Sequence, residues 1–361
     1  MSTPADRARS ALRALFLGDA LAMPVHWFYN VADIDRAFPG GIRRLEAPPA
    51  RHPSSIMSLH STAGGGRRGA GAGGQPEVVG EIILKEKKAF WNRPNVHYHQ
   101  GMQAGDNTLN AYCTLALMRS MRSAGGRYSR AAFLDHYVAL MTADPPQHPD
   151  TYAESFHRGF FANLALGKPP EHCAAVTHDT PSIGGLVMIA PIVFAERLAG
   201  TALDQVQALC RQHLFLTHPD DALAVVCERY VTLLDRWLFA ANVETMREDL
   251  LDACLGLPRR ELATLIGGER TDRDVIGGRL SSACYISDAW PAVLYLAGRH
   301  GERPLDALLA NTNVGGDNAH RGAVLGVLMG LLHGDFADDL FTRLRIHETI
   351  DQHVAELLHG R

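Results

Sequence analysis

The sequence predicts an all-α fold, built as one compact multi-helix domain spanning residues 1–361. Apolar residues recur at intervals of three and four positions through most of the chain, which is the spacing of a single helix face. Alternating runs typical of strands are sparse, and Gly, Pro and Asp mark the connections between the periodic segments. A chain of 361 residues that is 46% hydrophobic and 20% charged has the composition of a globular protein with a substantial core.

In chain order, the periodic segments predict helices that are joined by short polar connections. The expected helices are Asp6 to Ala22, Thr108 to Ser123, Ala131 to Thr142, Tyr152 to Ala165, Gly185 to Leu198, Ala202 to Leu216, Asp220 to Ala241 and Ser287 to Arg299. Asp106 or Asn107, which precede the second of these helices, can cap its first turn.

The last predicted helix lies in the stretch NTNVGGDNAHRGAVLGVLMGLLH, residues 311–333. Gly315 and Gly316 permit a tight turn, and Asp317 follows as an expected N-cap. Glycines then recur every four residues and share one helical face, at Gly322, Gly326, Gly330 and Gly334. So many glycines weaken a solvated helix, so we expect this one to be central and to pack closely against another backbone.

One region breaks the helical regularity, the glycine-rich insertion at about residues 51–76. Its composition does not support a helix. One interpretation is a flexible surface insertion. The other is a lid or an anion-binding loop, in which Arg67 and Arg68 contact a phosphate.

Charge and cysteine content exclude several classes of protein. The formal net charge of −4 gives no overall electrostatic reason to bind nucleic acid or a membrane surface. No run approaches the roughly 20 apolar residues of a membrane span. The 6 cysteines lack CxxC spacing, which favours reduced thiols and a cytoplasmic location over a disulfide framework or a structural zinc site.

Five short polar clusters lie at the ends of predicted helices and are the candidate functional loops. They read GDALAMPVH from residue 18, HYHQGMQAGDNT from residue 97, DTPSIGG from residue 179, LTHPD from residue 216 and NVGGDN from residue 313. Unpaired amides at helix starts can orient phosphate or sugar oxygens.

The order of these motifs resembles the ADP-ribosylglycohydrolase family, from about residue 9 to residue 334. The resemblance rests on GDALAMP, GDNTLNAYCTLAL, SIGGLVMIAP, LTHPDDA, YISDAWPAVLYLA and NVGGDNAHRGAVLGVLMG. It implies one all-α domain with a cleft for ADP-ribose. It also implies a pair of magnesium ions, held by acidic pairs in GDDT-like and GGDTDT-like motifs and by a nearby hydroxyl.

The match of this sequence to the GDDT-like motif is partial. Asp106 and Thr108 match the first aspartate and the threonine, and the resemblance implies that both are metal ligands. Asn107 replaces the second aspartate, and we interpret it as a substrate-binding residue.

In the GGDTDT-like motif, Asp317 matches the first aspartate, but Ala319 and His320 replace the second aspartate and the threonine. His26 stands where many relatives end the first motif in glutamate. These changes remove carboxylates and add imidazoles. Magnesium prefers oxygen ligands, so the predicted set Asp106, Thr108, Asp317 and His320 favours a transition metal or no metal over two magnesium ions.

The sequence therefore predicts a hydrolase that cleaves an N- or O-glycosidic bond to ribose in an ADP-ribose-like or nucleotide-like small molecule or ADP-ribosylated substrate. The expected catalytic residues are Asp106, Asp317, His26 and His320. The expected substrate-binding residues are Asn107, Ser182, Gly184, Gly185, Gly315, Gly316, Asn318 and His99. Two alternatives remain, a non-catalytic binding or structural protein and an enzyme for a different small molecule. The sequence leaves the oligomeric state open.

Overall fold

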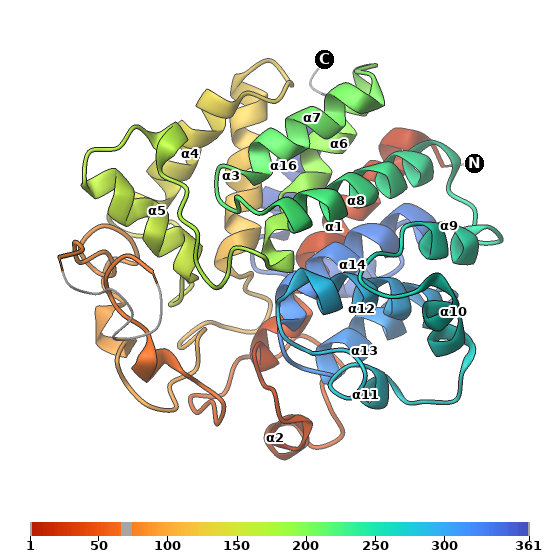
Figure 1. Ribbon diagram of the computed structural model, residues 1–361, viewed down its shortest axis with the longest axis horizontal. Helices are drawn as coiled ribbons and strands as arrows, with labels where there is room; N and C mark the ends of the chain where they lie inside the picture. The colour runs from red at the N-terminus through yellow and green to blue at the C-terminus, as the bar shows by residue number, and fades with distance from the viewer. Residues whose placement is uncertain (1, 66–73, 360–361) are drawn as a thin grey trace.

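Helices dominate the computed structural model, which describes residues 2–65 and 74–359 (Figure 1). In chain order the α-helices are α1 (Pro4–Ala22), α2 (Val31–Ala37), α3 (Leu109–Ser123), α4 (Arg130–Thr142), α5 (Ser155–Ala165), α6 (Ile189–Leu198), α7 (Leu203–Leu214), α8 (Asp221–Ala240), α9 (Met246–Asp252), α10 (Arg259–Gly267), α11 (Asp272–Val275), α12 (Ile286–Arg299), α13 (Pro304–Asn313), α14 (Asn318–His333), α15 (Asp338–Phe341) and α16 (His347–His359). Among the described residues, extended pairing is limited to isolated bridges. The predicted all-α class is confirmed.

The predicted helices are all present, with ends that shift by a few residues. The largest shifts concern α5, which begins at Ser155 rather than at Tyr152, and α6, which begins at Ile189 rather than at Gly185. In the second case the 3₁₀ turn η5 (Ile183–Leu186) precedes the helix. Both displaced starts lie in segments that approach the candidate site.

Helices α1 and α14 lie side by side at the centre of the molecule (Figure 1). A Cβ added at Gly326 would lie 2.1 Å from the carbonyl oxygen of Ala14, and one added at Gly330 would lie 2.5 Å from Cα of Ala11. The predicted close backbone packing is therefore confirmed for this face of α14. Gly334 is an exception, because it ends the helix with φ 68° and no atom lies within 4 Å of an added Cβ.

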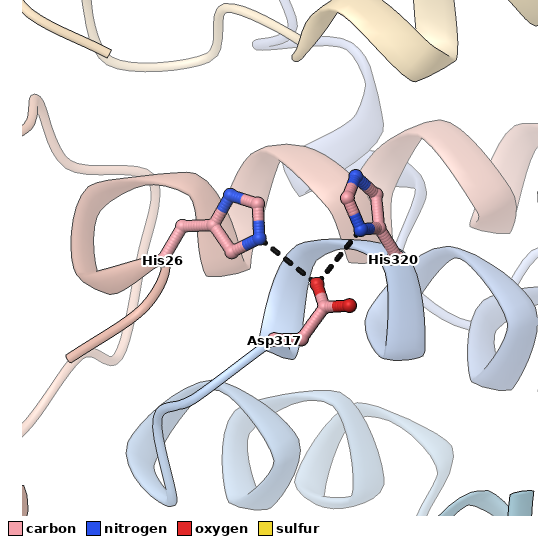
Figure 2. A group of neighbouring side chains, drawn as sticks. All are labelled: His26, Asp317 and His320. Atoms are coloured by element: carbon pink, nitrogen blue, oxygen red, sulfur yellow. Dashed lines mark hydrogen bonds and ion pairs between the residues drawn. The ribbon is translucent and has the colours of Figure 1, made fainter. Parts of the chain in front are cut away.

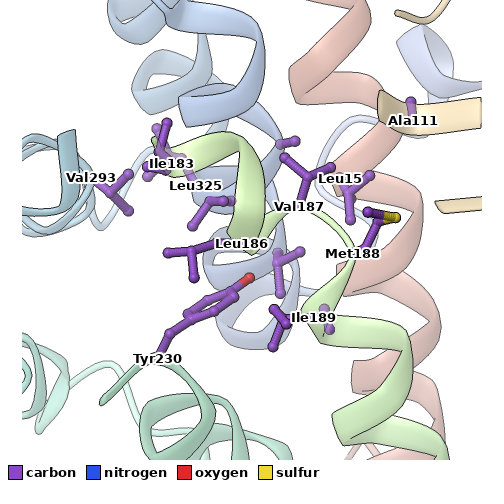
Figure 3. Packing of buried hydrophobic residues seen from close by; sticks show 14 of the residues in the cluster. Leu15, Ala111, Ile183, Leu186, Val187, Met188, Ile189, Tyr230, Val293 and Leu325 are labelled. Atoms are coloured by element: carbon purple, nitrogen blue, oxygen red, sulfur yellow. The ribbon is translucent and has the colours of Figure 1, made fainter. Parts of the chain in front are cut away.

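The segment around η5 packs its apolar side chains between α1, α12 and α14 (Figure 3). Leu186, Ile189 and Leu325 are fully buried there. The buried segment fixes the backbone that precedes α6, and thereby the loop that approaches the start of α14.

Side chains remote in sequence occupy the start of α3. Asp19, at the end of α1, accepts from the backbone N–H of Thr108 at 2.9 Å and from its hydroxyl at 2.6 Å. Asp150 accepts from the N–H of Leu109 at 2.7 Å. The prediction that Asp106 or Asn107 caps this helix is therefore wrong. Thr108 is the N-cap residue and makes no side-chain capping hydrogen bond, and Asp19 and Asp150 bind the first two backbone amides at this helix start.

The structure confirms the N-cap position predicted for Asp317 but not the capping hydrogen bond. The carboxylate instead faces two imidazoles, which are stronger partners for an ionised group than a backbone amide.

In the glycine-rich insertion, the structure gives a short 3₁₀ turn at Met57–Leu59 and a bridge between Ala63 and Glu77. Arg67 and Arg68, the predicted phosphate ligands, lie outside the described residues. All 6 cysteines are unpaired, and Cys254 and Cys284 are only partly buried. Within the described part of the chain, no helix has the length and apolar character of a membrane span.

Candidate active site

Three buried side chains converge where α14 begins, His26, Asp317 and His320 (Figure 2). The Nε2 atom of His26 lies 2.9 Å from Oδ1 of Asp317, and Nδ1 of His320 lies 2.8 Å from the same oxygen. The carboxylate and both rings are 0–3% exposed. The second oxygen, Oδ2 of Asp317, is buried without a hydrogen-bond partner among the described residues. We call these three residues the central cluster.

The backbone brings residue 26 to residue 317 through a short two-way pairing. The N–H of Trp27 donates to the carbonyl of Gly316 at 2.7 Å, and the N–H of Gly316 donates to the carbonyl of Phe28 at 2.8 Å. Gly315 and Gly316 both have φ 66°, and a Cβ at Gly316 would lie 1.9 Å from the carbonyl oxygen of Ser282. The two glycines therefore allow the chain to approach closely and to aim Asp317 at His26.

A line of buried groups extends from both sides of the central cluster, and we call it the histidine–carboxylate chain. Its members, in order, are Asp150, His99, His26, Asp317, His320 and Glu154. On one side, His26 Nδ1 contacts His99 Nε2 at 2.8 Å, and His99 Nδ1 contacts Asp150 Oδ1 at 2.7 Å. On the other side, His320 Nε2 lies 3.1 Å from Glu154 Oε1.

Burial and charge act in opposite directions along this chain. Burial alone lowers the pKa of His320, but the carboxylates of Asp317 and Glu154 outweigh it and raise the pKa well above its ordinary value. Burial raises the pKa of Asp317, and the facing imidazoles reverse that shift and lower it. Burial lowers the pKa of His26 and raises the pKa of Glu154 to about 7. The cluster thus holds a cationic His320 against an ionised Asp317.

The contacts of the histidine–carboxylate chain need more protons than neutral imidazoles and ionised carboxylates supply. This chain has five contacts, each of 2.7–3.1 Å, and a contact between two lone pairs repels unless a proton or a cation lies between them. Three neutral imidazoles supply three protons and ionised carboxylates supply none, so five contacts need two further protons. The whole histidine–carboxylate chain therefore needs two more protons than its neutral rings supply, and a cationic His320 provides one of them.

A single divalent cation at the central cluster meets that requirement. The three protons of the neutral rings would then all point outward, from His26 to His99 and from His99 to Asp150. On the other side, Nε2 of His320 faces Oε1 of Glu154 at 3.1 Å and the amide of Asn110 at 2.6 Å, and that amide would turn its oxygen toward the ring. Ligating histidines in metal sites typically donate their other ring N–H to such a partner. Two imidazoles and one carboxylate, with Oδ2 of Asp317 unpaired, match the donor set of one transition ion.

The donor set does not fit the pair of magnesium ions that the family resemblance implies. Asp106 accepts from the N–H of Gln103 at 2.7 Å, and its other oxygen lies 3.4 Å from Nε of Arg345. Thr108 donates its hydroxyl to Asp19 rather than to the cluster. With Ala319 in place of a carboxylate, Asp317 is the one acidic residue in the cluster.

The remaining predicted residues near the first two motifs have structural contacts. Asn107 donates to the carbonyl of Phe16 at 2.7 Å and to Asp19 at 2.8 Å. His99 extends the histidine–carboxylate chain, as described above. Asn318 donates to the carbonyl of Thr312 at 2.9 Å and holds the turn before α14.

The SIGG segment meets the cluster at one residue. A Cβ added at Gly184 would lie 3.6 Å from Nδ1 of His320, so this glycine borders the imidazole. Gly185 borders Leu214, Leu223 and His218 instead. Ser182 is 3% exposed and bridges to Tyr285.

Next to the cluster lies a cavity of about 310 Å³, which has the size of a small-ligand site. Its lining residues are Trp27, Tyr29, Ser54, Ile56, His60, Tyr98, Tyr152, His178, Asp179, Ala283, Cys284 and Tyr285. None of the residues predicted to bind substrate is among them. We call it the aromatic cavity.

Trp27 joins the aromatic cavity to the central cluster. Its ring lines the cavity and stacks on His26, with the ring centroids 3.7 Å apart and the planes 20° from parallel. Trp27 also has φ 62°, a backbone conformation that is strained for an aromatic residue. One indole ring therefore forms a wall between the cavity and the buried imidazole.

Sequence reasoning missed Asp150 and Glu154, which end the histidine–carboxylate chain. Both belong to the run DTYAES at residues 150–155, which the periodicity assigned partly to the interior of a helix. The helix begins only at Ser155, so both carboxylates precede it and turn toward the cluster. The available signal was two acidic residues four positions apart before an apolar run.

Comparisons with known proteins agree with this architecture. The family model for ADP-ribosylglycohydrolase matches residues 1–361. No curated protein matches the chain. Among solved structures, one described as an ADP-ribosylglycohydrolase-related protein complex is similar over 99% of both chains, with 18% identity and a TM-score of 0.60, which shows a shared fold. The chain belongs to the ADP-ribosylglycohydrolase family.

Proposed function

We propose that this protein hydrolyses an N- or O-glycosidic bond to ribose in an ADP-ribose-like or nucleotide-like compound, with the central cluster as the centre that activates water. The observation that carries the proposal is the contact between Trp27 and His26, since a single indole ring separates a cavity of ligand size from His26 of the central cluster. Cleavage of such a bond develops oxocarbenium character, which a nearby carboxylate stabilises.

The residues around the cluster have separable roles. His99 and Asp150 fix the ring of His26, because they hold its Nδ1 side and leave Nε2 directed at Asp317. Glu154, with a pKa of about 7 caused by burial, can give or take a proton near neutrality. It therefore suits proton transfer better than Asp317, whose pKa the two imidazoles lower.

We further propose that the cluster holds one transition ion, with Zn²⁺ as the best match to two nitrogens and one oxygen. When bound, such an ion lowers the pKa of a coordinated water and so supplies a nucleophile near neutral pH. His26, Asp317 and His320 would be its ligands. The outward contacts to His99 and Glu154 would orient the two rings.

The test compares two aspartates that the sequence treats alike and the structure separates. Purified protein, analysed for metals, is incubated with peptides that carry ADP-ribose on arginine or serine and, separately, with a nucleotide whose ribose carries nicotinamide, and the released ADP-ribose is measured. We expect Asp317→Asn to lower the rate by at least about 100-fold, since it removes a group that acts in the reaction. Asp106→Asn should stay within about threefold of the wild type, because Asp106 contacts Arg345 and Gln103 instead.

Absence of release from every substrate, or equal rates for wild type and Asp317→Asn, would contradict the proposal. A second candidate function is binding of an ADP-ribose-like ligand without turnover. The single carboxylate of the cluster favours it, since the family's paired acidic ligands are reduced to Asp317. Ligand binding by calorimetry with no released product would identify this second function.

A further inference from the structure

The walls of the aromatic cavity are rings packed edge to face. The rings of Trp27 and Tyr98 have centroids 4.6 Å apart, those of Trp27 and Tyr152 are 5.1 Å apart, and those of Tyr98 and Tyr152 are 4.9 Å apart. Tyr29 and Tyr285 also line it and are 49% and 43% exposed, so they lie toward the solvent side. Ring faces of this kind attract planar molecules and cations.

The phenol groups of the two inner tyrosines are already engaged. The hydroxyl of Tyr98 accepts from the N–H of Ile56 at 2.9 Å, and the hydroxyl of Tyr152 lies 2.8 Å from Nδ1 of His60. Their contribution to the cavity is therefore mainly the ring surface.

Asp179 adds a carboxylate to this aromatic lining. Its Oδ2 accepts from the N–H and the hydroxyl of Ser155 at 2.8 and 2.5 Å, which positions the group at the start of α5. Its Oδ1 lies 3.2 Å from Nε2 of His178, and both side chains line the cavity. One oxygen thus has a structural role, while the other faces a second lining residue.

Asp179 is the one carboxylate among the described residues of the cavity lining. Burial raises the pKa of the Cys284 thiol, and the carboxylates of Asp317, Asp179 and Glu154 raise it further. Burial also raises the pKa of the Tyr29 phenol, and the carboxylates of Asp317 and Asp179 raise it further. Among the described residues that line the cavity, none is a lysine or an arginine. The buried guanidinium of Arg158 lies near Tyr152, 5.8 Å from its ring, but is not part of the lining.

We propose that the aromatic cavity selects a planar organic cation, with the ring between the aromatic walls and the positive charge toward Asp179. Resting on the proposed function, this identifies the substrate class as a glycoside whose leaving group is a cationic nitrogen heterocycle. The phosphate groups of an ADP-ribose-like substrate then lie outside this cavity, because the carboxylates repel them.

The test uses two probes that differ by one methyl group and one charge, 1-methylnicotinamide as the cation and nicotinamide as the neutral ring. Calorimetric titration of the full chain measures both affinities. We expect the cation to bind at least tenfold more tightly. Asp179→Asn should reduce that preference to less than about threefold while nicotinamide still binds, and Asp306→Asn, at a half-buried carboxylate outside the cavity lining, should leave it unchanged.

Asp179→Asn also weakens the start of α5, so Tyr285→Leu provides a second variant. It removes an aromatic wall without touching a charge, and both probes should bind several-fold more weakly. Equal affinities for the two probes in the wild type, or tighter binding of the neutral ring, would overturn the inference.

Asp317→Asn separates the inference from the proposed function. Charge-selective binding that persists in this variant while hydrolysis is absent supports the cavity assignment independently of catalysis. Hydrolysis of ADP-ribosylated peptides by a wild type without charge selectivity would refute the inference and leave the proposed function standing.

Discussion

At the scale of single residues, the contacts of His26, Asp317 and His320 depend on their neighbours. Asp317 occupies a helix start and in isolation would be a cap, but its Oδ1 receives two imidazoles instead. The proton count shows that the rings need additional positive charge to sit where they do. Either one divalent ion or two protons can supply the positive charge between Asp317 and the two imidazoles.

Titration of Glu154 makes the free energy of unfolding depend on pH. Burial raises its pKa to about 7, above the ordinary value of about 4.3, so the folded state binds more protons than the unfolded state in this window. The contribution of protonated Glu154 to the free energy of unfolding is full below about pH 4.3 and is lost as the pH rises through 7. We expect the free energy of unfolding of the metal-free protein to lose about 3 kcal/mol over that range.

Denaturant unfolding from pH 4.5 to pH 8 measures this loss, with Glu154→Gln as the control. The glutamine has nearly the same shape and does not titrate, so its curve should lack this slope. An equal slope in both proteins would assign the pH dependence to another group.

At the scale of helices, the packing of α1 against α14 positions the residues of the site. Gly18 faces Gly322, and Ala14 faces Gly326, so the two backbones approach closely. Asp19 lies in the last turn of α1 and fixes the loop at Thr108, while Asp317 is the N-cap residue of α14. Close packing of these two helices therefore sets the positions of both motifs.

Gly326→Ala tests this contact. The new methyl group would lie 2.1 Å from the carbonyl oxygen of Ala14, so the helices must separate. We expect a loss of about 2–3 kcal/mol in the free energy of unfolding, typical of an overpacked core. Gly267→Ala is the matched control, because its nearest atom is the end of the Arg247 side chain at 3.4 Å, and alanine favours a helix.

Chemical denaturation of both variants gives the comparison. Gly267→Ala should be neutral or stabilising by up to about 1 kcal/mol. Equal stability of the two variants would mean that α1 and α14 do not pack as closely as the structure has them.

At the scale of the whole molecule, the fold brings together loops that are up to 291 positions apart, such as those of His26 and Asp317. An ion bound by these loops stabilises the fold that creates its site. We expect Zn²⁺ at 100 times its Kd to add about 2.7 kcal/mol to the free energy of unfolding.

Thermal unfolding with and without Zn²⁺ tests this linkage. The increase in Tm should persist in Asp106→Asn and disappear in Asp317→Asn. An equal increase in both variants would place the ion elsewhere.

The sequence predicted the helices well, because apolar periodicity is a local property. It also selected His26, Asp317 and His320, through motif positions rather than through geometry. Asp150 and Glu154 escaped prediction because their roles depend on where α5 begins and on partners 41 to 166 positions away. The prediction for Asp106 rested on a motif match, and the structure gives its carboxylate to Arg345 and Gln103.

The central claim is that one divalent ion replaces protons at the central cluster. Titration of Zn²⁺ into metal-free protein in weakly buffered solution at pH 7 measures both quantities at once. We predict one ion per chain and release of about one to two protons, since the cationic His320 and the partly protonated Glu154 lose them. Asp317→Asn should abolish the binding. Binding of two magnesium ions, or of zinc without proton release, would contradict the account.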